Sequence, residues 1–353
     1  MSPRSLAALA ALAFAAATHG AEPSGARVSR DRFVEEIRSI QAALENREFE
    51  KLERLHDALV ASRARTSDGT WMTESFEWAF DESFRNDTPA RLDRLLADWR
   101  RAAPSSILRP IAEAFVWQNR AWRARGSGCS PGWIAGAEEV YARHLQRAAS
   151  ALEGAAQAKA SPLWYTVAIR VAGGERRTAS AIEALLEEGE SRHPAYRPLY
   201  LARLTFLLPA WGGDFGQVDR FARWAAERTR ASEAGSFYAG LHVDLARVEC
   251  GDQLGQSRVS WPDMKQGLLD MIERHDASWN WNLLGTFACR FRDWEETARV
   301  LAKLGKEANL GIWSRGISTR SCREMVRPEP LPARMSFLPR RAGDGRPAGV
   351  LAG

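Results

Sequence analysis

Helix-start signals recur along the whole chain, and they constrain the fold more than any other feature of the sequence. Three segments place a cap residue directly before a proline: Thr88-Pro89, Ser130-Pro131 and Ser161-Pro162. Proline is tolerated at the first helical position because the N–H that it lacks has no partner inside the helix there. Each of these dipeptides therefore predicts the beginning of a helix.

Two further starts resemble capping boxes, in which two side chains satisfy each other's free backbone donors. They are Asp214 with Gln217 and Asp293 with Glu296. Between the start signals, apolar residues recur at spacings of three and four, which is the period of a helix with one buried face. The clearest series are Phe33-Ile37-Ile40-Leu44, Leu92-Leu95-Leu96-Trp99 and Ile182-Leu185-Leu186.

The predicted helices are separated by short breaks, at residues 65–70, 125–132, 173–174 and 209–213. Connections of this length force consecutive helices to run antiparallel. No segment has the alternating pattern of a strand, and a composition of 45% hydrophobic and 26% charged residues is that of a globular protein. We predict an all-α fold of about fourteen helices that form stacked antiparallel hairpins.

One segment illustrates the expected unit, a helix–turn–helix of about 34 residues at 279–313. Its first helix carries Leu283, Leu284 and Phe287, and its second begins at Asp293. Residues 217–250 form a similar pair. The length and texture are tetratricopeptide-like, so we expect the hairpins to stack into a right-handed superhelix with a concave face.

The N-terminus has the order of charge, apolar run and small residues that is typical of a secretory signal. Arg4 precedes the apolar residues 6–17, and small residues follow up to Ala21. The run is shorter than the ~20 residues that span a bilayer, and no later segment is long enough. We predict a signal peptide at 1–21, a helical-repeat domain at 22–323, a disordered Arg- and Pro-rich tail at 324–353, and a periplasmic or secreted protein without a transmembrane segment.

The net charge of +5 is concentrated at the two ends of the chain. Arg4 leaves with the signal, and the segment from residue 315 onward holds eight Arg and three acids, so the body between them sums to −1. A nucleic-acid groove needs basic residues clustered on folded elements. We therefore expect no nucleic-acid partner, and a peripheral contact with the envelope is conceivable only through the tail.

The chain has four cysteines, at Cys129, Cys250, Cys289 and Cys322. An even number in an exported protein permits disulfides, and their spacing fits no zinc site. A Cys289–Cys322 bridge would join the C-terminal extension to the last hairpin and stabilise it by ~3 kcal/mol. Cys250–Cys289 is the alternative, and Cys129 would then stay free.

Two short segments contain candidate binding residues. Trp122, Arg123 and Arg125 stand near the end of a long helix, where two guanidinium groups suit an anion or carboxylate. The structural alternative is that these cations complement the helix C-terminus. In residues 209–214, Trp211 offers a stacking surface and Asp214 a polar group; alternatively, Trp211 packs under a turn and Asp214 caps the next helix.

No catalytic residue, metal site or cofactor is predicted. The chain lacks H-E-x-x-H, P-loop and G-x-G-x-x-G patterns, and its paired glutamates fit solvated helix faces. We therefore predict an exported, non-enzymatic helical-repeat binding or scaffold protein whose concave face holds a protein or peptide partner. The alternative is an envelope enzyme that acts on a glycan or a peptide.

Eight short segments in order resemble the bacterial proteins that share domain of unknown function 4034. The resemblance runs over residues 33–323 and implies a helical, tetratricopeptide-like fold, but it implies no activity and no catalytic residue. The tail is not part of it. The segments are RTSDGTW (65–71), WRRAAPSS (99–106), AWRARGSG (121–128), SPLWY (161–165), LLPAWGGD (207–214), WPDMKQG (261–267), NLLGTFAC (282–289) and Cys322-Arg323.

Overall fold

The computed structural model describes residues 28–126, 136–246, 258–308 and 319–325. Within these ranges every regular element is a helix, and two isolated bridges, Val28–Thr66 and Arg65–Trp71, are the only strand-like pairings. The all-α prediction is confirmed. The signal peptide, Ser130-Pro131, Cys129, Cys250 and nearly all of the predicted tail lie outside the described residues.

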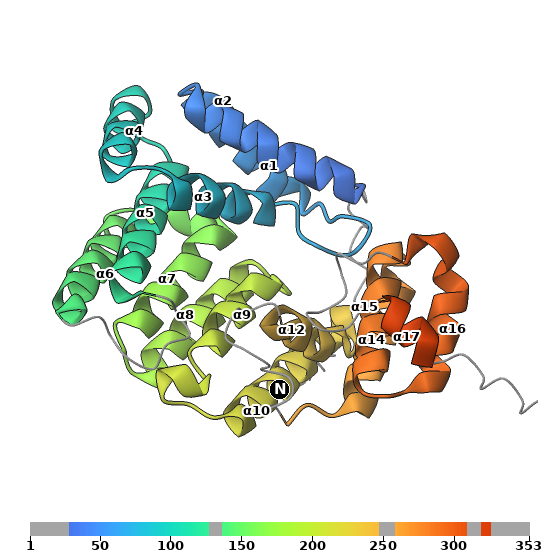
Figure 1. Cartoon of the computed structure of the whole chain (residues 1–353). Helices are drawn as coiled ribbons and strands as arrows, with labels where there is room; N and C mark the ends of the chain where they lie inside the picture. Colours follow the sequence, from blue (N-terminus) through green and yellow to red (C-terminus); the bar gives the residue numbers. More distant parts are fainter. Residues whose placement is uncertain (1–27, 127–135, 247–257, 309–318, 326–353) are drawn as a thin grey trace, which may run out of the picture.

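The helices form an inner and an outer layer (Figure 1). Inner helices contribute side chains to a central cavity, and the first five of them pack on one another in sequence order. They are α3 (Glu74–Asn86), α5 (Leu108–Arg125), α7 (Pro162–Gly174), α9 (Arg197–Thr205), α12 (Ser236–Ala246) and α15 (Ser278–Arg290). The outer helices are α6 (Ala137–Glu153), α8 (Ala179–Arg192), α10 (Phe215–Arg228), α14 (Trp261–Arg274) and α16 (Trp294–Leu304).

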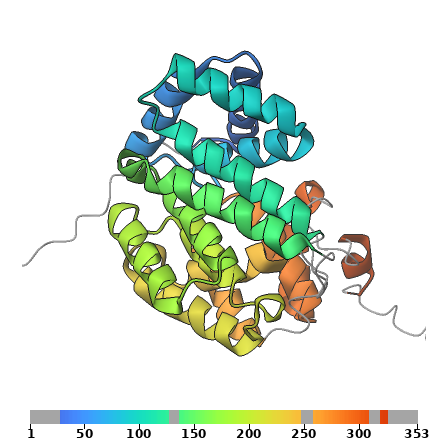
Figure 2. The same cartoon turned by 90° about the vertical axis from the view of Figure 1, so that its left-hand side faces the viewer.

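The N-terminal helices lie above this array. α1 (Arg30–Glu45) packs on α3 and α2, and α4 (Pro89–Ala102) packs on α5. Figure 2 shows the α5–α6 pair between these helices and the α7–α10 group below. The remaining elements are α2 (Phe49–Ser62) and five short ones: η1 (Ala156–Ala160), η2 (Pro209–Trp211), α11 (Arg230–Glu233), η3 (Gly305–Glu307) and α17 (Thr319–Met325).

The predicted helix starts within the described residues are confirmed by their caps. Thr88 and Ser161 each accept a hydrogen bond from a backbone N–H in the first turn of α4 and α7, with proline next in sequence. Asp214 and Asp293 accept from the third residues of α10 and α16. Gly173 and Gly174 were expected to lie in a break between two helices. They are instead the last two residues of α7 and are buried.

The predicted hairpin at 279–313 is present as α15 and α16, which pack along each other. The pair predicted at 217–250 is less simple, because α11 separates α10 from α12, and α12 also packs on α14. A disulfide between Cys289 and Cys322 ties α17 to α15, with a Cα–Cα distance of 6.0 Å. The right-handed superhelix remains a prediction.

The loop that follows α2 closes the array of helices on itself. Its Asp68 carbonyl accepts a hydrogen bond of 3.2 Å from Nδ2 of Asn280 on α15. The guanidinium of Arg30, at the start of α1, lies 3.7 Å from the ring centre of Trp279. Gly69 adopts a φ of +91°, which favours glycine, and a Cβ there would lie 2.8 Å from the His275 ring. The first and last described parts of the array therefore meet, and the cavity lies inside.

Across the described residues, every helix is too short or too polar to cross a lipid bilayer.

Candidate functional site

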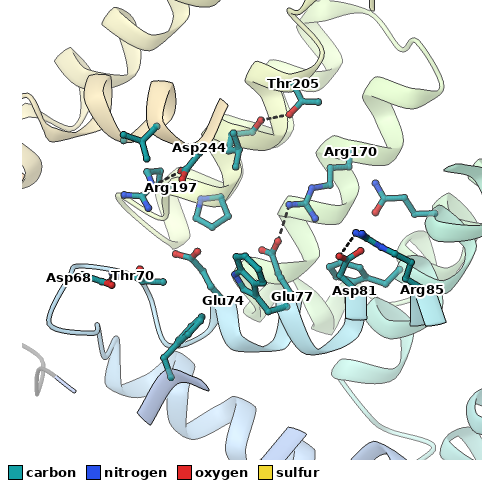
Figure 3. Close-up of a pocket in the computed structure, with 18 of the residues that line it drawn as sticks. Asp68, Thr70, Glu74, Glu77, Asp81, Arg85, Arg170, Arg197, Thr205 and Asp244 are labelled. Carbon is teal, nitrogen blue, oxygen red and sulfur yellow. Dashed lines mark hydrogen bonds and ion pairs between the residues drawn. The ribbon is translucent and has the colours of Figure 1, made fainter. Parts of the chain in front are cut away.

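The inner helices line an open cavity of about 770 Å³ (Figure 3). Pockets of ~300–1,000 Å³ are typical of sites that bind small molecules. Its walls come from α1, α3, α5, α7, α9, α12, α14, α15 and the loop after α2. A site of this size, built from every part of the fold, is the strongest candidate for a functional site in the described residues.

One face of α3 forms a charged wall of the cavity. Glu74, Glu77, Trp78, Asp81 and Arg85 line it, and they recur at spacings of three and four. The opposite face of α3 is apolar and buried, since it carries Phe76, Phe80 and Phe84 in the core. Because the phenylalanines hold that face in the core, the charged face of the helix is turned toward the cavity.

Two carboxylates of the cavity are paired with arginines from other helices. Arg170 on α7 donates to Glu77 at 2.9 Å, and Tyr196 also donates to Glu77, at 3.4 Å. Arg197 on α9 pairs with Asp244 on α12 at 3.0 Å. Burial alone would lower the pKa of Arg197, but Asp244 and the neighbouring carboxylates outweigh it and raise that pKa. Both pairs are visible in Figure 3.

The loop after α2 supplies a third pair. The side chain of Asp68 is 1% exposed and accepts from the Arg30 guanidinium and from the Thr70 hydroxyl, the latter at 2.8 Å. Burial would raise the pKa of Asp68, but Arg30 and the hydroxyls of Thr66 and Thr70 hold it below its usual value. At the other end of α3, Arg85 pairs with Asp81 one turn before it. These contacts leave four arginines of the lining already neutralised.

Glu74 differs from the other carboxylates of the lining. Its carboxylate accepts a hydrogen bond of 3.1 Å from the Trp71 backbone N–H, and it has no ion-pair partner among the described residues. Burial raises the pKa of Glu74 to about 7, with Arg197 acting in the opposite direction and Glu77 and Asp244 adding to the increase. Glu74 is therefore a lining carboxyl that changes its charge near neutral pH.

Two amide side chains of the lining have hydrogen-bonding atoms without a partner. Asn280 is 1% exposed; its Nδ2 donates to two backbone carbonyls, whereas its Oδ1 is buried and accepts nothing. On the other side of the cavity, Nδ2 of Asn119 is buried and donates to nothing. Buried polar atoms are nearly always hydrogen-bonded, so an unpaired acceptor and an unpaired donor on two residues of the lining are unusual.

Aromatic side chains complete the lining. Trp78 is 55% exposed although it lies in the cavity wall, and Trp122, Trp279, Phe33 and Phe115 line the cavity with it. An indole face offers both apolar contact area and an attraction for cations. The cavity thus combines paired charges, unpaired amide atoms and aromatic surface.

The residues predicted from the sequence divide between the cavity and its surroundings. Trp122 and Arg123 line the cavity, and Arg123 donates to the Phe84 carbonyl near the end of α3. Trp211 meets Trp122 edge to face, with ring centres 5.2 Å apart. Arg125 is buried, with its guanidinium 4.4 Å from the Trp211 ring centre. Trp211 and Arg125 therefore pack directly behind the cavity wall.

Asp214 lies away from the cavity, at the exposed start of α10. Its carboxylate accepts a hydrogen bond of 2.8 Å from the Gln217 N–H and thereby caps the helix. The preceding Gly213 leaves room for the turn, since a Cβ there would lie 2.0 Å from the Leu207 carbonyl oxygen. In this structure, the contacts of Asp214 are those of a cap residue.

Most of the lining was not identified from the sequence. Glu74, Glu77, Arg170, Arg197 and Asp244 come from four helices, and no short motif contains more than two of them. One residue of the sequence could have drawn attention to this wall of the cavity: Trp78 is a large aromatic residue on an otherwise charged face of α3.

Three residues outside the cavity resemble the arrangement of a serine hydrolase, with His56 and Ser161 buried and Asp57 exposed. Nε2 of His56 lies 2.7 Å from Oγ of Ser161, and its Nδ1 lies 3.2 Å from Asp57. However, Ser161 is 0% exposed, its Oγ caps α7 by accepting from the Leu163 N–H, and none of the three residues lines the cavity. A nucleophile must reach its substrate, so this group serves to join α2 to α7.

Among the described residues, no three His, Cys, Asp or Glu side chains come close enough together to hold a metal ion. Comparison with protein-family models, with curated proteins and with solved structures found no match for this chain.

Proposed function

We propose that this chain is an exported binding protein that holds a short peptide segment in its central cavity. The observation that carries the proposal is the open cavity of about 770 Å³, whose lining combines residues with unpaired amide atoms, paired charges and the exposed ring of Trp78. A site of this volume suits a few residues in extended form better than the surface of a folded domain. The proposed partner is accordingly a peptide, or the tail of a protein.

The unpaired atoms match the groups that every peptide backbone carries. Nδ2 of Asn119 lacks an acceptor, and a backbone carbonyl is one; Oδ1 of Asn280 lacks a donor, and a backbone N–H is one. Arginines that are already paired are held in place before the ligand arrives, so less side-chain freedom is lost on binding. Both features favour a preformed peptide site.

Export is supported by two features of the chain. The apolar N-terminal segment has the pattern of a secretory signal, and the Cys289–Cys322 disulfide suits an oxidising compartment. We propose that the protein acts in the periplasm or outside the cell.

The direct test is capture of peptides by the mature protein, residues 22–353, from a pool of random peptides identified by mass spectrometry. Asn119→Trp fills the cavity without breaking a side-chain hydrogen bond that the structure contains. Gln146→Trp, on the exposed face of α6, adds the same side chain outside the cavity. We expect wild type and Q146W to enrich the same peptides and N119W to enrich none. Equal enrichment by all three proteins, or by none, would overturn the proposal.

An enzyme is the second candidate, and Glu74 is the observation that favours it. Its pKa of about 7 is in the range that enzymes use for a general acid or base. The test is to incubate the protein with glycan strands and with peptides and to analyse the products. A product formed by wild type and not by Glu74→Gln would favour catalysis, whereas intact substrates would argue against it.

A further inference from the structure

We propose that the peptide presents a basic side chain, lysine or arginine, to Glu74 and Trp78. This inference rests on the proposed function and specifies the ligand of the same cavity. It is drawn from the balance of charge in the lining, from the geometry of α3 and from the unpaired acceptor of Asn280.

Ion pairing within the lining leaves one carboxylate, Glu74, and one arginine, Arg123, without an opposite charge. Arg30, Arg85, Arg170 and Arg197 each pair with an acid of the lining, and Arg123 donates to backbone carbonyls of α3 and the residue after it. Glu74 has no cation of its own among the described residues. A buried carboxylate is costly unless it is paired, so a ligand that brings a cation gains an interaction that this chain leaves open.

The geometry of α3 provides a second element of recognition. Glu74 and Trp78 are four residues apart on the helix, so they are neighbours on one face, and both line the cavity. The Trp78 ring is 55% exposed. An ammonium or guanidinium group over an indole face is attracted to it, and a carboxylate one turn away completes the pairing.

The unpaired atom of Asn280 is the independent observation that points to a ligand with donors. This side chain is 1% exposed and its Nδ2 is fully used, so only Oδ1 is left, and Oδ1 is an acceptor. Glu74 is likewise an acceptor when it is ionised. Oδ1 of Asn280 and the Glu74 carboxylate, which accepts only the Trp71 N–H, can both accept further N–H groups, and lysine, arginine and the peptide backbone all supply these.

Binding of a cation should depend on pH, because it requires Glu74 to be ionised. Burial raises the pKa of Glu74 to about 7, so the carboxyl is mostly protonated at pH 6 and mostly ionised at pH 8. Affinity for a basic peptide should therefore increase over that interval. The other charged groups around Glu74 are each held in an ion pair within the lining: Glu77 and Asp81 on α3, Arg170 on α7, Arg197 on α9, Asp244 on α12, Arg30 on α1 and Asp68 in the loop.

The test uses three pools of pentapeptides with blocked ends, randomised except for a central lysine, norleucine or glutamate. Binding to the mature protein is measured by calorimetry at pH 6 and pH 8. We expect the lysine pool to bind at least about tenfold more tightly than the norleucine pool at pH 8, since a charged hydrogen bond and a cation–π contact are gained. Glu74→Gln should abolish that preference and its pH dependence, and Glu138→Gln on the exposed face of α6 should preserve both.

The outcomes separate the two proposals. Equal binding of the three pools, or preference for the glutamate pool, would overturn this inference and leave the peptide-binding function standing. A lysine preference that persists in E74Q would also overturn it, because the cation would then bind elsewhere. If no pool binds to the wild-type protein, both proposals are wrong.

Discussion

Replacing Glu74 with glutamine should stabilise the protein at pH 8 and leave its stability almost unchanged at pH 4.5. Glutamine has the shape of a protonated glutamate but cannot ionise. In the folded protein, burial raises the pKa of Glu74 from an ordinary value of 4.5 to about 7. The native state therefore keeps this proton to higher pH than the unfolded chain does, and its stability falls as the pH rises from about 4.5 through 7.

The magnitude follows from the same two values. A tenfold change in acid dissociation corresponds to about 1.36 kcal/mol, so the change from 4.5 to about 7 amounts to about 3 kcal/mol at pH 8. This is an upper limit, because part of the side chain faces the cavity and stays in contact with water. We expect Glu74→Gln to gain about 1–3 kcal/mol at pH 8 and less than about 0.5 kcal/mol at pH 4.5.

Urea unfolding followed by tryptophan fluorescence, at pH 4.5, 6, 7 and 8, measures this difference. Glu77→Gln is the matched control, since Glu77 lies on the same face of α3 but is paired with Arg170. That variant should lose stability at pH 8, because it leaves the arginine without its partner. A gain in E74Q that is the same at every pH, or a loss at pH 8, would refute the assignment of Glu74 as a buried, unpaired carboxyl.

Three further predictions concern the frame around the cavity. Cys289→Ser with Cys322→Ser should lower the free energy of unfolding by about 3 kcal/mol, because the bridge closes a loop with a sequence separation of 33; equal urea midpoints for the variant and the oxidised protein would contradict this. Gly69→Ala should cost about 1–3 kcal/mol, since φ is +91° and the new Cβ would meet His275, and faster hydrogen exchange in the loop after α2 should accompany the loss. Asp214→Ala should cost about 1 kcal/mol in thermal unfolding through the lost cap of α10, with peptide binding unchanged; lost binding would instead assign Asp214 to a ligand site.

The helices were predictable because their signals are local. A cap side chain accepts a hydrogen bond from a residue two or three positions later, so a helix start can be predicted without knowledge of the rest of the fold. The predicted starts at Thr88, Ser161, Asp214 and Asp293 are confirmed for this reason. The two glycines at 173–174 were interpreted as a break between helices, because the reason for their presence is not local. Their place at the end of α7 depends on a distant contact, since a Cβ at Gly173 would lie 2.3 Å from the Phe206 ring. The sequence does not show that glycine is needed for close packing, because Phe206 is distant in the chain.

The cavity was not predictable in the same way, because its charges meet only when the array closes. Arg170 and Glu77 are 93 residues apart in the chain, and neither stands in a recognisable motif. The candidate residues that the sequence predicts lie near turns, where glycine, tryptophan and arginine are conspicuous. Among them, Trp122 and Arg123 line the cavity, but no turn marks the α3 wall.

The sequence of α3 separates two faces of the helix. Phe76, Phe80 and Phe84 supply the buried face, so Trp78 is not needed for the core. An exposed tryptophan alone does not identify a site, since Trp224 and Trp294 on the outer helices are also exposed. What distinguishes Trp78 is that it shares a face with Glu74, Glu77 and Asp81, and that all four line the cavity. Glu74 and Trp78 are therefore the first pair to mutate in a search for the ligand.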